Sequence, residues 1–258
     1  MKFLRKFNEH TSYEAEVNVG GDFKIPNVSY CKDVKDVHFN PYNLIKFYVG
    51  EITTETPQTV KIYTDSRTSI EVTVSTGNKW YSYLLPKDKG LYKIEGDSVK
   101  KVNVKADINT YGNIIIPTST VEASFKGSDT SKAYNICKMF RNCSGLISLD
   151  VSSFDTSNQD NLSLMFENCA KLESLDLSSF NTSKVNDMTE MFNGCAALTS
   201  LDLSGWDMSI ETIFTNDMFK GCGALKEIKM IGCKQPTVNK IKAQLTTDGV
   251  TGATITTK

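Results

Sequence analysis

"MTEMFNGCAALTSLDLSGW", residues 188 to 206, is one copy of a pattern that recurs through the second half of the chain. Aligned on Met-Phe-x-x-Cys, the copies start at Met139, Met165, Met191 and Met218, which gives spacings of 26, 26 and 27 residues. A fixed period of this length is the signature of a solenoid, in which each repeat buries its apolar face only against its neighbours.

The local structure of one copy can be predicted from its periodicity. "SLDLS" alternates apolar and polar residues, which indicates a short strand with one buried face. Upstream, apolar residues at offsets 0, 3, 6, 7 and 10 are typical of one helix face; they are Val185, Met188, Met191, Phe192 and Cys195. Each unit is therefore expected to contain a strand, a turn, a short helix and a loop, with neighbouring strands about 4.8 Å apart.

The repeat also carries a family resemblance. The strand pattern L-x-x-L-x-L with a preceding Cys is the leucine-rich-repeat pattern, and "MF-x-x-C-x-x-L-x-S-L-D-L-S" resembles the BspA-like repeats of bacterial surface proteins over roughly residues 129–230. The last copy departs from the pattern at Glu227 to Met230, as expected for an end unit. The tail predicts a closing cap, with a helix begun at Pro236 and a strand after the Asp248-Gly249 turn.

The middle of the chain has a different pattern. Six β-type segments are separated by turn residues, namely LIKFYVGEI, TVKIYT, SIEVTVS, KWYSYLL, LYKIEG and VKKVNVKADI. Short strands at this spacing predict a small antiparallel, sandwich-like domain of the Ig-like kind. The expected fold class is therefore mixed α/β in four parts: an N-terminal anchor (1–42), a β-rich domain (43–123), a leucine-rich-repeat solenoid (124–230) and a C-terminal cap (231–258).

The first 42 residues are polar with scattered aromatics. The blocks "RKFNEHTSYEA", "PNVSYC" and "VHFNP" resemble the leader of structural proteins of crAss-like Bacteroides phages. The resemblance implies an anchor that attaches to other virion proteins, capsid or tail, although a closed hydrophobic cluster is an alternative for the same aromatics. The candidate anchor residues are Phe7, Tyr13, Pro26, Tyr30, His38, Phe39 and Pro41.

The recurring cysteines predict a column of thiols: Cys143, Cys169, Cys195 and Cys222. Stacked at strand spacing, they cannot surround one zinc ion, whose sulfur ligands lie about 2.3 Å from the metal. Disulfides between coils would need one geometry and an oxidising compartment. Free buried thiols that act as small apolar residues are therefore expected, and no metal site.

The polar residues of the repeated strands form the candidate recognition face. They are Ser148, Asp150, Ser174, Asp176, Ser200, Asp202, Glu227 and Lys229. Stacked like charges are unfavourable, so either the Asp side chains bond nearby backbone and Ser hydroxyls, or the column binds a cation or another ligand. The structural alternative is favoured, yet this face is the one that leucine-rich repeats commonly use for partners.

Composition and motifs argue against several functions. The 29 basic and 30 acidic residues give a net charge of −1, which does not favour nucleic-acid binding. No apolar run reaches the roughly 20 residues of a membrane span, and early charges interrupt any secretory signal. The two histidines, His10 and His38, have no triad context, and no phosphate-binding motif occurs. A non-enzymatic protein without catalytic residues or cofactor is expected.

Two functions remain in competition. One is a virion structural protein made in the host cytoplasm, of the head-fibre, capsid-decoration or tail-fibre type. The alternative is a BspA-like adhesin on the bacterial cell surface, binding a surface protein or glycan through the repeats. A depolymerase would need two carboxylates facing a cleft, which a flat Asp column does not provide. A homo-oligomer is expected for a virion fibre, although no sustained heptad run provides a coiled coil.

Overall fold

The computed structural model describes residues 14–17, 45–64, 67–74, 81–86, 90–104, 106–108, 112 and 114–258. The candidate anchor residues and both histidines lie outside these ranges. The described chain is mostly β, with a single helix and a β-solenoid of about five turns. The expected fold class is therefore confirmed in part: the described residues contain the solenoid, but they are mostly β rather than mixed α/β.

The six segments predicted between residues 44 and 108 are confirmed as strands. They are β2 (Ile45–Thr54), β3 (Gln58–Tyr63), β4 (Ser69–Val74), β5 (Tyr81–Pro86), β6 (Lys93–Glu95) and β7 (Val99–Asn103), and a further strand, β1 (Glu14–Val17), precedes them. β3 pairs antiparallel with β4 and β6 in one sheet, and β2 pairs antiparallel with β1, β5 and β7 in another. Ile52, Val60 and Ile62 from the two sheets are buried in the same continuous apolar core.

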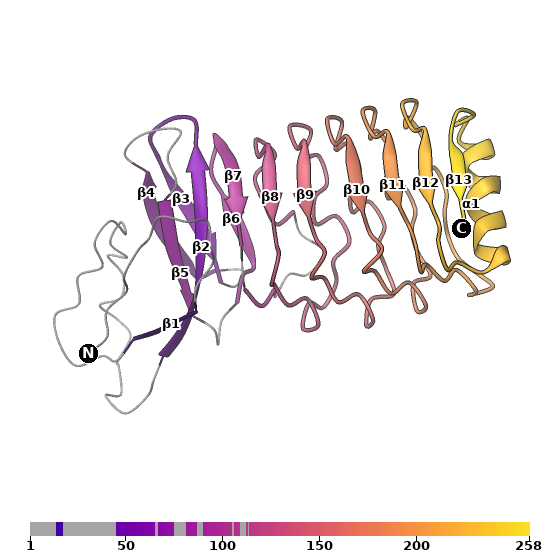
Figure 1. Ribbon diagram of the computed structural model, residues 1–258. Coiled ribbons are helices and arrows are strands. Elements are labelled where there is room, and N and C mark those ends of the chain that lie inside the picture. Colours follow the sequence, from indigo (N-terminus) through magenta and orange to yellow (C-terminus); the bar gives the residue numbers. More distant parts are fainter. Residues whose placement is uncertain are drawn as a thin grey trace.

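The solenoid strands stand in one row along the molecule (Figure 1). They are β8 (Glu122–Ser124), β9 (Ser148–Asp150), β10 (Ser174–Asp176), β11 (Ser200–Asp202), β12 (Glu227–Lys229) and β13 (Thr254–Thr256). The parallel pairing begins at β7, which bonds β8. The sheet that contains β2 and β7 therefore continues through β9, across the predicted boundary at residues 123 and 124. The domain boundaries themselves stay predictions.

The expected helix in each repeat is absent from residues 129–230, and the reason lies in the backbone hydrogen bonds. A helix directs each N–H to the carbonyl four residues earlier. Here the N–H of Phe192 donates to the carbonyl of Met218 one coil later (2.9 Å), and Gly194 donates likewise to Lys220 (2.8 Å). This side of the coil is therefore a second ladder between coils.

Tight turns explain why the spacing of the apolar residues resembles that of a helix face. The N–H of Met191 donates to the carbonyl of Met188 (3.2 Å), and that of Cys195 to Phe192 (3.1 Å). Bonds to the third residue back bring a side chain inward about every three positions, close to the spacing of a helix face. Left-handed residues between them, Glu190 (φ 55°) and Gly194 (φ 76°), prevent a continuous helix.

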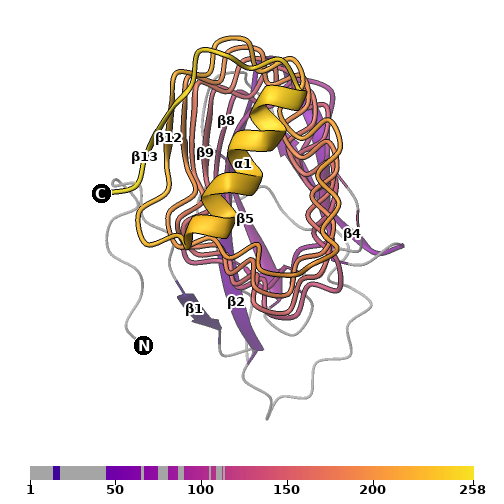
Figure 2. The same ribbon diagram turned by 90° about the vertical axis from the view of Figure 1, so that its right-hand side faces the viewer.

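Identical positions stack along the axis, as the end-on view shows (Figure 2). Phe140, Phe166, Phe192 and Phe219 form a column with ring centroids 5.6–5.7 Å apart and nearly parallel planes. A second column joins Phe154 to Phe180 at 6.4 Å. Because every coil contributes the same apolar side chains, each buries a face that it could not bury alone.

A cap closes the C-terminal end, as the tail predicted. The helix α1 (Gln235–Thr247) has Pro236 in its first turn and lies across the end of the core (Figure 2). It buries Val238, Ile241 and Leu245, and β13 adds a last parallel strand to β12. The predicted helix and closing strand are both confirmed. Neither α1 nor any other described segment is a helix long and apolar enough to cross a membrane.

Candidate functional site

The outward residues of the solenoid strands form one surface, named the strand face below. The strand registers align two polar columns across it, with Ser174, Ser200, Glu227 and Thr254 in the first and Asp176, Asp202, Lys229 and Thr256 in the second. Ser148 and Asp150 occupy the same positions on β9, the strand next to β10 (Figure 1). The structure thus brings all eight predicted face residues onto one side of the solenoid.

The strand face extends beyond the predicted residues at both ends. Glu122 pairs in register with Ser148, and its carboxylate forms an ion pair with Lys101 at 2.7 Å. At the other end, Thr254 follows Glu227 in the first column. Glu122 and Thr254 lie outside the LDLS copies, so the repeat pattern did not place them on the strand face. Glu122 stands 26 residues before Ser148, and this repeat spacing is the signal that could have found it.

The Asp residues of the strand face cap the turns that follow the strands. The Asp176 carboxylate accepts hydrogen bonds from the backbone N–H (2.9 Å) and the hydroxyl (2.7 Å) of Ser178. Asp150 does the same for Ser152, and Asp202 accepts from the N–H of Ser204. Of the two roles expected for the Asp column, these contacts match the structural one, in which the carboxylates bond nearby backbone and Ser hydroxyls.

The same contacts leave part of each carboxylate free. Only Oδ1 of Asp150 and of Asp176 accepts these bonds, and Oδ2 has no hydrogen-bond partner among the described residues. Within the described part of the chain, no three His, Cys, Asp or Glu residues gather in a way that could hold a metal ion. The strand face therefore offers hydroxyls and carboxylate oxygens on a flat surface.

The four ladder cysteines lie in the core as free thiols. The Sγ of Cys169, Cys195 and Cys222 each donates to the carbonyl of the Phe one coil earlier, at 3.1–3.2 Å. Burial raises the pKa of Cys143 and of Cys222 to about 12. A thiol that stays protonated and hydrogen-bonded is neither a nucleophile nor a metal ligand.

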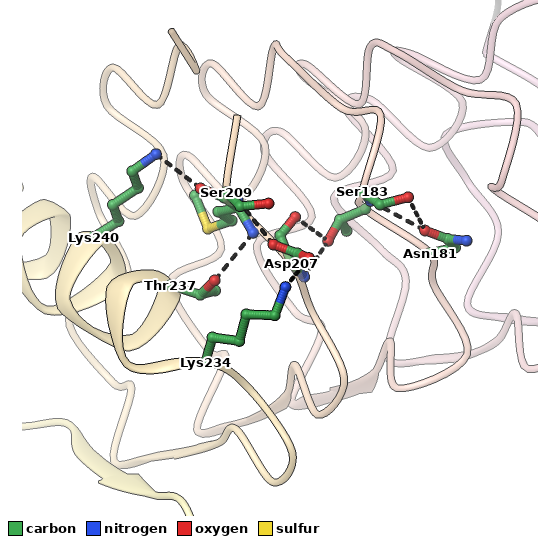
Figure 3. A network of polar contacts seen from close by, with 9 residues as sticks. Asn181, Ser183, Asp207, Ser209, Lys234, Thr237 and Lys240 are labelled. Carbon is green, nitrogen blue, oxygen red and sulfur yellow. Dashed lines mark hydrogen bonds and ion pairs between the residues drawn. The ribbon is translucent and has the colours of Figure 1, made fainter. Parts of the chain in front are cut away.

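Turn-capping side chains also recur from coil to coil away from the strand face. Asn181 accepts from the N–H of Ser183 (3.1 Å), and Asp207, one coil later, accepts from that of Ser209 (2.9 Å) (Figure 3). Thr182 joins the two coils, because its hydroxyl donates to the carbonyl of Asp207 (3.0 Å) and accepts from its N–H (2.8 Å). The hydrogen bond from Ser209, followed by that from a lysine of the cap, lowers the pKa of Asp207.

The cap completes this network where the coils end (Figure 3). Lys234 forms the ion pair with Asp207 (3.1 Å), and the Thr237 hydroxyl accepts from the N–H of Met208 (3.1 Å). Lys240 donates to two main-chain carbonyls, one of them that of Met208 (2.8 Å). The helix α1 therefore satisfies backbone groups that a further coil would otherwise bond.

The fold and the strand face define the class: the chain contains a β-solenoid of stacked repeats that presents a polar face. Residues 113–230 match the family described as "Mycoplasma protein of unknown function, DUF285". The match and the stacked coils are compatible with the predicted BspA-like repeat protein. No curated protein matches the chain, and no solved structure matches it. The leader resemblance lies outside the matched residues and stays a prediction.

Proposed function

We propose that the chain is a non-enzymatic binding protein whose strand face contacts a partner. The observation that carries this proposal is a face that no other described element covers, while both solenoid ends are covered, one by the β2–β7 region and the other by α1. On that face Ser148 and Ser174 are exposed, and their hydroxyls have no hydrogen-bond partner among the described residues. A rigid stack with free polar groups in register is suited to recognition of a large surface.

Within this proposal, the chain acts in a virion of a crAss-like Bacteroides phage. It would be a head fibre, a capsid decoration or a tail-fibre-type component, anchored by residues 1–42 and projecting the solenoid as a homo-oligomer. The leader motifs support this role. They do so independently of the repeats, because they occur in a separate part of the chain.

The alternative is a BspA-like adhesin on the bacterial surface, which binds a protein or glycan through the same face. The observation in its favour is the family match of residues 113–230, which includes β8 to β12. Both roles use the strand face, so they differ in where the chain is found rather than in how it binds.

Localisation separates the two roles. Peptides of the chain are expected in purified phage particles at a copy number comparable with other structural proteins, and absent from outer-membrane fractions of uninfected cells. The opposite distribution would replace the virion role with the adhesin.

A variant pair tests the strand face itself. Ser174→Arg places a large cation in the first column, whereas Asn186→Arg places one at an exposed position off the strands. Binding of the purified chain to bacterial cells or to particles is expected to fall at least tenfold for Ser174→Arg and to be unchanged for Asn186→Arg. Equal binding by the two variants, with equal thermal stability, would show that the strand face does not bind the partner.

A further inference from the structure

One edge of β2 is shared by a strand from the body of the protein and a strand from the leader. Phe47 and Tyr48 pair with β1 and also with β5, so these two strands lie on opposite edges of β2. Glu51 and Ile52 pair with β5 and also with β7, which therefore lies opposite β5 as well. Consequently β1 and β7 lie along the same edge, one after the other.

The leader strand fills the part of this edge that β7 leaves open. β7 pairs with residues 51–54 of β2, and β1 pairs antiparallel with residues 45–48. Without β1, the N–H and C=O groups of this segment would form an open edge, which readily accepts a strand from another chain. Among the described elements, β2 is the only strand with which β1 pairs.

We propose that residues 45–48 of β2 are a strand-docking slot that accepts β1 of a second copy in place of the chain's own β1. The connection between the two strands, residues 18–44, has 27 residues and can span up to about 90 Å. It is therefore long enough for β1 to reach a neighbouring molecule. Exchange keeps the same four register pairs and needs no new interface.

The concentration needed for exchange follows from the covalent connection between β1 and β2. Pairing of the chain's own β1 is intramolecular, and pairing between covalently joined segments typically corresponds to an effective concentration on the order of 1 mM. Isolated molecules at micromolar concentration therefore keep β1 in cis. Copies held side by side in an assembly reach comparable local concentrations, and there the exchanged strand links neighbours. This inference concerns how copies join and does not depend on the strand face.

A peptide experiment tests whether the slot accepts a strand in trans. In the full-length chain, Ala15→Pro combined with Glu16→Pro disables β1, because successive N–H groups point to opposite edges and one of the two prolines removes a ladder donor. A fluorescent peptide of residues 11–20 is expected to bind this variant at least tenfold more tightly than the wild type. The same peptide with both prolines is the control. No binding to the variant, or equal binding to both proteins, would overturn the slot.

A cross-linking experiment tests the second copy as the occupant. Ala15 and Phe47 are register partners, so one chain carries Ala15→Cys and the other Phe47→Cys. Mixed at about 1 mM and oxidised, they are expected to form a disulfide between positions 15 and 47 of different chains, mapped by mass spectrometry. Absence of this link, while a single chain with both substitutions closes it internally, would overturn exchange between copies.

Discussion

Thr120 has a buried hydroxyl whose removal is expected to stabilise the protein rather than destabilise it. It lies 26 residues before Leu146 and occupies the same place at the end of a coil, where the later coils have a buried leucine. Thr120 is 0% exposed and its Oγ1 has no hydrogen-bond partner among the described residues. A buried hydroxyl without a partner destabilises the folded state by about 1–3 kcal/mol.

Replacing this hydroxyl with a methyl group is therefore expected to stabilise the protein. Thr120→Val keeps the shape of the side chain and should raise the free energy of unfolding by about 1 kcal/mol. The matched control is Thr182→Val. Thr182 is 1% exposed, but its hydroxyl both donates to and accepts from the backbone of Asp207. The same change there should lower the free energy of unfolding by about 1–3 kcal/mol.

Urea unfolding followed by circular dichroism measures both effects as shifts of the midpoint at constant slope. The expected result is a higher midpoint for Thr120→Val and a lower one for Thr182→Val. If Thr120→Val lowered the midpoint, the Thr120 hydroxyl would have a partner in the folded protein and the reasoning would be refuted. A change in slope would instead report an altered unfolded or folded state.

Three further outcomes are expected. At pH 8 a pKa of about 12 leaves about one Cys222 thiol in 10⁴ ionised. Iodoacetamide should therefore label Cys222 roughly 10³-fold more slowly than an ordinary exposed thiol, and far more slowly than the half-buried Cys233. Comparable labelling rates of the native protein, measured by mass spectrometry, would contradict this expectation. Lys138 has φ 61°, so Lys138→Gly should be neutral or stabilising by up to about 1 kcal/mol in thermal unfolding, whereas the control Lys171→Gly should destabilise by about 0.5–1 kcal/mol. The pKa of Asp207 is lowered in the folded state, so its contribution to stability is present above the unfolded pKa of about 3.9 and is lost as pH falls through the lower folded pKa. Asp207→Asn should therefore reduce the loss of unfolding free energy at acid pH. An unchanged loss would show that other carboxylates dominate the acid dependence.

The strand positions were predictable because their signal is local. Alternation in "SLDLS" and the repeat spacing placed β9, β10 and β11, and Pro236 with the Asp248-Gly249 turn placed the cap. Each of these signals needs only the residues of one or two coils. The strand β8 was not predicted, because its sequence lacks the motif and only its pairing with β7 and β9 places it in the row of solenoid strands.

The helix prediction failed for a different reason. Met188, Met191 and Phe192 do point into the core, as predicted, and all are fully buried. Their spacing of about three residues is compatible both with a helix and with successive tight turns. The direction of the backbone N–H groups distinguishes the two, and that direction depends on the next coil, which no window of one repeat contains.

The sequence by itself determined the period, and with it which residues stack in columns: the phenylalanines, the thiols, and the Ser and Asp positions of the strand face. Tertiary structure alone decided what those columns do. The partner of a backbone N–H, the burial that keeps a thiol such as Cys222 protonated, and the serine that occupies Oδ1 of Asp176 are set by contacts formed when the chain coils. The physical reason is that one repeat specifies which side chains face inward, whereas hydrogen bonds between coils exist only once two coils are in register.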